Sequence, residues 1–158
     1  MPEIRKPSTA LTMARVWADE DMDEVRVAIE GPDAGFAINA YLGRTDQRDV
    51  LESLCRFAKQ IYGGLCEVRF GEFGPEYANG AVHLRFHWID GQIYITCRLQ
   101  AHFDTFGRKE AADEALIHVG TEPALFDVFL ASLAPFVDRQ THKVELELVP
   151  TSASPLPS

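Results

Sequence analysis

The feature that most constrains the fold is an alternation of apolar and polar residues over residues 81–100, interrupted once by Asp90-Gly91. A period of two is typical of a strand with one buried face. An Asp-Gly pair between two such runs predicts a two-residue type I′ turn, because both turn residues must adopt positive φ. We therefore predict a β-hairpin in which Trp88 lies opposite Ile93 on the apolar face.

The other face of this hairpin is cationic and aromatic. In the predicted register, His83 lies opposite Arg98 and His87 lies opposite Tyr94. Arg and Tyr are enriched at binding hot spots, and a basic patch is unexpected in a chain of formal net charge -9. We predict a binding surface, the hairpin face, formed by His83, Arg85, His87, Tyr94 and Arg98. The alternative is that these side chains simply cover a solvent-facing sheet.

The remaining pattern predicts an α+β chain. Further runs with a period of two predict strands over residues 11–18, 25–29, 36–42, 66–70, 115–119 and 144–149. Apolar stripes at helical spacing predict one helix from Asp46 to Gly63-Gly64 and a second that opens at Thr121-Glu122-Pro123. Tight turns between strands imply antiparallel pairing. We expect a two-layer sandwich, a mostly antiparallel sheet of about six to eight strands with two amphipathic helices packed on one face.

The chain of 158 residues has the size of one domain. A domain of this length buries roughly 70% of its unfolded surface, which is enough for a self-sufficient core. We predict a flexible N-terminal arm over residues 1–10 and a single domain over residues 11–149. The Ser- and Pro-rich residues 150–158 predict a disordered C-terminal tail.

A second candidate surface is the acidic segment between the first two predicted strands. It carries five carboxylates in six residues, Asp19, Glu20, Asp21, Asp23 and Glu24. This density of charge predicts an exposed loop that could meet a basic partner. The alternative is a solvated loop without a binding role.

Net charge and hydropathy exclude several classes of function. Nucleic-acid binding depends on Lys and Arg that neutralise phosphates, so the charge of -9 argues against it. No run approaches the ~20 apolar residues of a membrane-spanning helix. Because the N-terminus lacks the apolar region of a secretory signal, we expect a cytoplasmic protein.

The histidines do not predict a metal site. His83 and His87 share a face, but residues four apart on a strand are separated by about 13 Å, too far for one ion. His102 and Asp104 form only a pair of ligands. The sequence therefore predicts neither a metal nor another cofactor.

The residues do not predict an enzyme. Nucleophile elbows, phosphate-binding glycine loops and HExxH helices are missing from the sequence. Three cysteines without a CxxC pair predict reduced thiols, which act as small hydrophobes where they face the core. We therefore predict no catalytic residue.

The segment from about residue 36 to residue 135 resembles WapI-type immunity proteins, the bacterial partners of polymorphic or contact-dependent toxins. The resemblance is carried by residues 49–54 and 61–65, the strand Glu67–Phe70, the hairpin segment Gly91–Ile95 and the closing helix from Leu125 to Leu133. It implies a small non-catalytic inhibitor that binds a toxin domain, and it assigns no individual residue a role.

The sequence thus predicts an acidic protein-binding domain, most simply an immunity or antitoxin-like inhibitor of a bacterial toxin with a basic surface. One alternative is a small-molecule-binding domain or small enzyme with a pocket between sheet and helices. Another is a structural subunit of a larger complex. The oligomeric state stays open.

Overall fold

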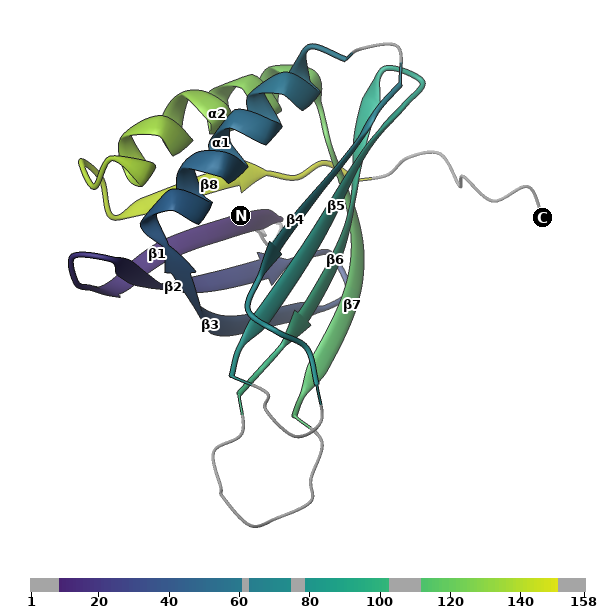
Figure 1. The fold of residues 1–158 in the computed structure, drawn as a ribbon. Coiled ribbons are helices and arrows are strands. Elements are labelled where there is room, and N and C mark those ends of the chain that lie inside the picture. Colours follow the sequence, from purple (N-terminus) through teal and green to yellow (C-terminus); the bar gives the residue numbers. More distant parts are fainter. Residues whose placement is uncertain (1–8, 61–62, 75–78, 103–111, 151–158) are drawn as a thin grey trace, which may run out of the picture.

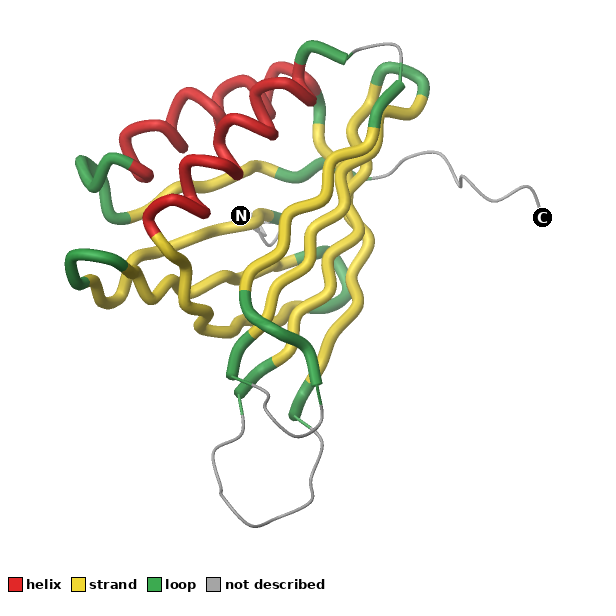
Figure 2. Tube along the Cα trace, viewed as in Figure 1, coloured by secondary structure: helices red, strands yellow, loops and turns green. Residues whose placement is uncertain are grey.

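The computed structural model describes residues 9–60, 63–74, 79–102 and 112–150. Within them lie eight strands and two helices, which confirms the α+β class (Figures 1 and 2). In chain order the elements are β1 (Ala10–Ala18), β2 (Met22–Glu30), β3 (Gly35–Gly43), α1 (Arg44–Ala58), β4 (Leu65–Phe70), β5 (Ala81–Ile89), β6 (Gln92–Gln100), β7 (Glu114–Thr121), α2 (Pro123–Val137) and β8 (Lys143–Glu147).

The eight strands form two antiparallel sheets of four, where the sequence pattern predicted one sheet. The first has the order β3-β2-β1-β8 and the second the order β4-β5-β6-β7. The division follows from connectivity, because α1 separates β3 from β4 and lets the chain begin a new sheet. After α2 the chain returns, and β8 pairs with β1.

The two helices lie in the angle between the sheets, whose strands cross steeply (Figure 1). The inner faces of both sheets and the apolar sides of the helices form one hydrophobic core. Its centre is aromatic. Phe57 of α1 packs against Phe86 and Trp88 of β5 and against Phe126 of α2, with ring centroids 5.7–6.0 Å apart. These rings occupy the interface where the alternative hypothesis placed a ligand pocket.

The central hairpin forms as predicted. Asp90 and Gly91 have φ values of 50° and 78°, as a type I′ turn requires. Trp88 pairs with Ile93 in the predicted register. The indole nitrogen of Trp88 also donates a hydrogen bond of 2.8 Å to the carbonyl of Phe57, which joins the second sheet to α1.

Several predicted boundaries shift. The predicted N-terminal arm overlaps β1 by one residue, since Ala10 is buried and pairs with Glu30. Helix α1 ends at Ala58, before the predicted stop at Gly63. Residues 1–8 and 151–158, which cover most of the predicted arm and tail, lie outside the described residues.

Candidate functional site

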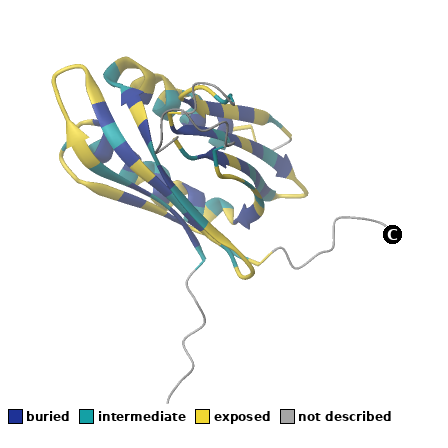
Figure 3. Ribbon diagram, turned by 90° about the horizontal axis from the view of Figure 1, so that it is seen from below, coloured by how far each residue is buried: buried dark blue, intermediate teal, exposed yellow. Residues whose placement is uncertain are grey.

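The five predicted residues of the hairpin face lie on β5 and β6, on the side of the second sheet opposite the helices. His83 pairs with Arg98 and His87 with Tyr94, which confirms the predicted register. Buried residues alternate with more exposed ones along the strands (Figure 3). Arg85 and Arg98 are exposed, whereas the two histidines and Tyr94 are half-buried. The hairpin face is therefore a surface feature, as its pattern predicted.

The flanking strands extend this face with residues that sequence reasoning missed. They are Leu65, Glu67 and Arg69 on β4 and Leu116 and His118 on β7. Arg69 lies opposite His83, so the order Arg69, His83, Arg98 crosses three adjacent strands. The connections 71–80 and 101–113 are too long to reveal the pairing from sequence. The sequence indicated only, through the alternation within β4 and β7, which side chains of each strand share a face.

Glu67 organises one half of the extended face. Its Oε1 atom lies 3.5 Å from the Nε2 atom of His83 and 3.8 Å from the Nε atom of Arg85. Burial lowers the pKa of His87, and the neighbouring charge of Arg85 lowers it further, while Glu67 opposes the shift. His87 is therefore a neutral imidazole at pH 7.

Arg98 is held by two contacts on the other half. It forms an ion pair with Glu114 of β7, and its guanidinium lies over the ring of Phe73, 4.1 Å from the centroid. Such contacts reduce the freedom that a long side chain loses on binding. Because Glu67 and Glu114 lie beside its arginines, the hairpin face has mixed charge, in contrast to the cationic face predicted from the hairpin alone.

The prediction of an exposed acidic loop is wrong in one respect. The turn contains only residues 19–21, because β2 begins at Met22. Asp23 is buried, with 0% of its surface exposed, although it was predicted to face solvent. Asp19, Glu20 and Asp21 are exposed, and Glu24 is half-buried on the outer face of β2. Four of the five carboxylates thus remain available to a partner.

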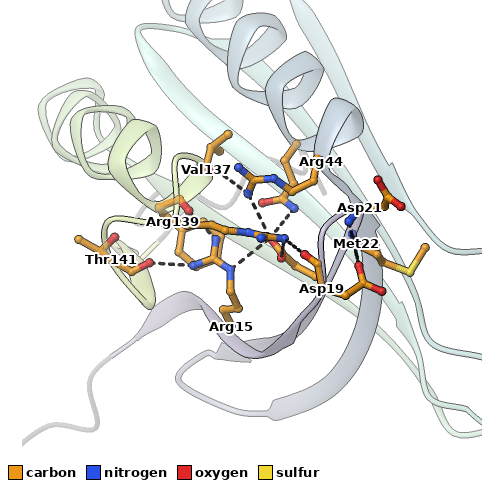
Figure 4. A network of polar contacts seen from close by, with 11 residues as sticks. Arg15, Asp19, Asp21, Met22, Arg44, Val137, Arg139 and Thr141 are labelled. Atoms are coloured by element: carbon orange, nitrogen blue, oxygen red, sulfur yellow. Dashed lines mark hydrogen bonds and ion pairs between the residues drawn. The ribbon is translucent and has the colours of Figure 1, made fainter.

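Three arginines surround the buried carboxylate of Asp23. They come from β1, from α1 and from the turn after α2 (Figure 4). The shortest nitrogen–oxygen distances from Asp23 are 3.1 Å to Arg15, 3.6 Å to Arg44 and 2.7 Å to Arg139. Gln47 adds a hydrogen bond of 2.7 Å to the same carboxylate. Such a buried charge is tolerated only because it is paired and hydrogen-bonded.

Two of these arginines also bind the C-terminal end of α2. Arg15 donates to the carbonyl of Phe136 at 2.5 Å and stacks over its ring, 4.5 Å from the centroid. Arg44 donates to the carbonyl of Val137 at 2.9 Å. A helix C-terminus carries partial negative charge and unpaired carbonyls. The end of α2 therefore offsets part of the positive charge that the single carboxylate of Asp23 leaves unbalanced. We call Asp23 and its partners Arg15, Arg44, Gln47 and Arg139 the Asp23 cluster. The cluster joins the first sheet to both helices.

The cysteines are free, as predicted. Burial raises the pKa of Cys97 to about 12 and also raises the pKa of Cys66. Both are protonated thiols at neutral pH, and nucleophilic attack requires the thiolate.

In the part of the chain that the structure describes, no three His, Cys, Asp or Glu side chains are grouped to hold a metal ion. Asp104, the other member of the His102–Asp104 pair, lies outside that part. Within the same described residues, neither helix is long and apolar enough to cross a membrane.

The chain has no match among protein-family models, among curated proteins or among solved structures. Its function is therefore inferred from its surfaces. The resemblance to WapI-type immunity proteins stays a prediction.

Proposed function

We propose that this chain is a non-catalytic protein-binding domain that inhibits a bacterial toxin, in the manner of an immunity or antitoxin protein. The observation that carries the proposal is the extended hairpin face, where aromatic, cationic and acidic side chains share one side of a four-stranded sheet. An inhibitor of this kind acts by covering its partner. It needs a rigid, chemically varied surface and no reacting group.

The composition of the hairpin face suits a protein better than a nucleic acid. Its arginines are partly neutralised by Glu67 and Glu114, whereas phosphate binding depends on uncompensated positive charge. Exposed Leu65 and Leu116 lie on the same side, 49% and 62% exposed, and add apolar area. Mixed polar and apolar contacts of this kind are typical of protein–protein interfaces.

The net charge favours a partner with a basic surface. A formal charge of -9 attracts a positively charged protein over distances comparable with the screening length and speeds encounter. We expect the toxin domain to be basic, and the association rate to fall as salt is added. The inhibitory complex is cytoplasmic in this proposal and involves no membrane and no nucleic acid.

The function is tested by co-purifying the full chain with the products of neighbouring genes and by expressing each product with and without it. We expect one product to bind and to be toxic only when this chain is absent. A neighbour that binds without being toxic would instead indicate a structural subunit. Failure of every neighbour to bind, with no protection in any case, would reject the proposal.

The face itself is tested by the double variant Arg85→Glu and Arg98→Glu. Both side chains are exposed, and the reversal brings carboxylates beside Glu67 and Glu114. We expect the Kd for the partner to rise at least about tenfold, as is usual when hot-spot residues are lost. Isothermal titration calorimetry measures the change, and thermal unfolding checks the fold.

A matched control makes the same change in net charge elsewhere. Arg48→Glu with Lys143→Glu alters exposed residues of α1 and β8. We expect this variant to bind at least as fast, because the added negative charge attracts a basic partner, and to keep most of its affinity. If the two double variants lose affinity equally, the hairpin face is not the interface.

A further inference from the structure

One end of the first sheet exposes an unusual group of large apolar side chains. Val16, Trp17, Met22 and Tyr41 are 51%, 48%, 39% and 41% exposed. They lie at the end where β1 and β2 are joined by the acidic turn. Trp and Tyr are the residue types most enriched at binding hot spots. We call Trp17, Met22 and Tyr41 the aromatic patch.

A β-bulge turns Trp17 toward solvent. In β1, Leu11, Met13 and Arg15 pair with Ile29, Val27 and Val25, and all of these side chains belong to the inner face. Regular alternation would place Trp17 on that face too. The register shifts between Arg15 and Trp17, so that Trp17 pairs with Glu24 on the outer face. Bulges re-aim side chains in this way and are over-represented at functional sites.

The same register brings the two rings into one row. Glu24 pairs with Trp17 of β1 on one side and with Tyr41 of β3 on the other. The outer face therefore carries an aromatic ring, a carboxylate and a second aromatic ring on three adjacent strands. Side chains directly opposite one another on neighbouring strands have Cβ atoms about 5 Å apart, so they form a continuous surface.

Acidic residues border the aromatic patch. Asp19, Glu20 and Asp21 form the adjoining turn, and all three are exposed. Arg15, Arg44 and Arg139 are directed to the buried carboxylate of Asp23 (Figure 4). Arg26 lies one row further along the outer face, where it donates to Asn39. Lys143 of β8 lies in the same row as Arg26. At the surface, the border therefore has four carboxylates, those of Asp19, Glu20, Asp21 and Glu24, against the two cations Arg26 and Lys143.

The Asp23 cluster also holds the turn in one conformation. Arg139 donates to the carbonyl of Asp19 at 2.5 Å, and the amide of Arg44 donates to the carbonyl of Asp21 at 3.1 Å. The carboxylate of Asp19 accepts from the amides of Asp21 and Met22 at 2.9 and 2.8 Å. A surface ordered before binding loses less conformational entropy when a partner docks.

From this arrangement we infer that the aromatic patch docks a basic segment of a partner protein. Apolar side chains of the segment pack on Trp17, Met22 and Tyr41, and its Lys or Arg residues meet Glu20, Asp21 and Glu24. The charge of the border selects this occupant over an acidic or neutral segment. The inference goes beyond the proposed function, because it concerns the other sheet and stands whether or not the partner is a toxin.

The test uses the full chain and a short labelled peptide of Lys, Arg and Leu, with a second peptide in which Glu replaces each Lys and Arg. We expect fluorescence anisotropy to show binding of the basic peptide only. Binding should weaken strongly near 1 M salt, where the screening length is about 3 Å. The location of binding is tested by acrylamide quenching of tryptophan fluorescence. Trp88 is only 9% exposed, so the accessible emission comes mainly from Trp17. A peptide bound at the aromatic patch should therefore protect this emission from acrylamide.

The double variant Trp17→Ala and Tyr41→Ala should weaken binding of the basic peptide at least about tenfold. Its matched control, Ile89→Ala with Val128→Ala, removes exposed apolar side chains from β5 and α2 and should leave the affinity unchanged. Equal loss in both variants, or equal binding of both peptides, would overturn the inference. Sedimentation of the wild type and of both double variants tests for self-association. If the chain self-associates and only Trp17→Ala with Tyr41→Ala abolishes the self-association, the occupant of the aromatic patch is a second copy, and the inference is overturned.

Discussion

Replacing Asp23 with Ala should destabilise the folded protein by about 3–5 kcal/mol, the usual effect of removing one partner from a buried ion pair. The substitution leaves Arg15 without its carboxylate, although the side chain of Arg15 is only 6% exposed. It also removes the acceptor for Gln47, whose side chain is buried. Urea unfolding followed by circular dichroism measures the loss as a lower midpoint.

Asp21→Ala is the control for this prediction. Asp21 lies in the adjoining turn and is exposed, so the loss of its charge should change the free energy of unfolding by less than about 0.5 kcal/mol. If the two substitutions cost the same, the Asp23 cluster does not stabilise the junction of the first sheet with the helices.

The Asp23 cluster also predicts a dependence of stability on pH. Burial raises the pKa of Asp23, but the contacts with Gln47, Arg15 and Arg139 outweigh it and leave the pKa below the ordinary value of 3.8. A lowered pKa contributes stability that is complete well above 3.8 and is lost as the pH falls through the folded-state value. The free energy of unfolding should therefore fall more steeply below pH 4 in the wild type than in Asp23→Asn. Parallel curves would contradict this assignment.

Gly80→Ala should be strongly destabilising, costing more than about 4 kcal/mol. Gly80 has a φ of +85°, and a Cβ atom there would lie 2.0 Å from the carbonyl oxygen of Asn39. Asn39 belongs to β3 of the first sheet, and β5 of the second sheet begins at Ala81. The methyl group cannot be accommodated unless the two sheets move apart, which would open the shared core. Urea unfolding gives the cost.

Gly91→Ala separates the two causes of this effect. Gly91 has a similar φ of +78°, but a Cβ atom there would meet nothing within 4 Å. We expect it to cost only the left-handed backbone penalty, about 1–2 kcal/mol. The difference between the variants measures the close approach of the sheets. If Gly80→Ala costs no more than Gly91→Ala, the sheets do not meet at Gly80 as described.

Local pattern was sufficient for the central hairpin and for the residues of its outer face. A period of two assigns each side chain to one face, and the Asp90-Gly91 turn leaves only one register. His83, Arg85, His87, Tyr94 and Arg98 could therefore be placed on one surface before any tertiary contact was known. The class of fold followed from the same patterns, since the helices and the strands had distinct periods.

The neighbours of that face could not be predicted in the same way. Glu67 and Glu114 change it from cationic to mixed charge, and both reach it by pairing across long connections. Length and composition of a connection do not specify which strands become neighbours. The division into two sheets was hidden for the same reason, because it depends on where the chain goes after α1.

The sequence by itself therefore determined the elements, most of their faces and the antiparallel hairpins, all of which rest on contacts between residues close in the chain. Only the tertiary structure decided the charge environment. Asp23 was predicted to be exposed because its neighbours are acidic, yet Arg15, Arg44 and Arg139 arrive from three distant segments and make its burial favourable. Trp17 likewise reaches the surface through one bulge, a shift of register that alternation cannot reveal.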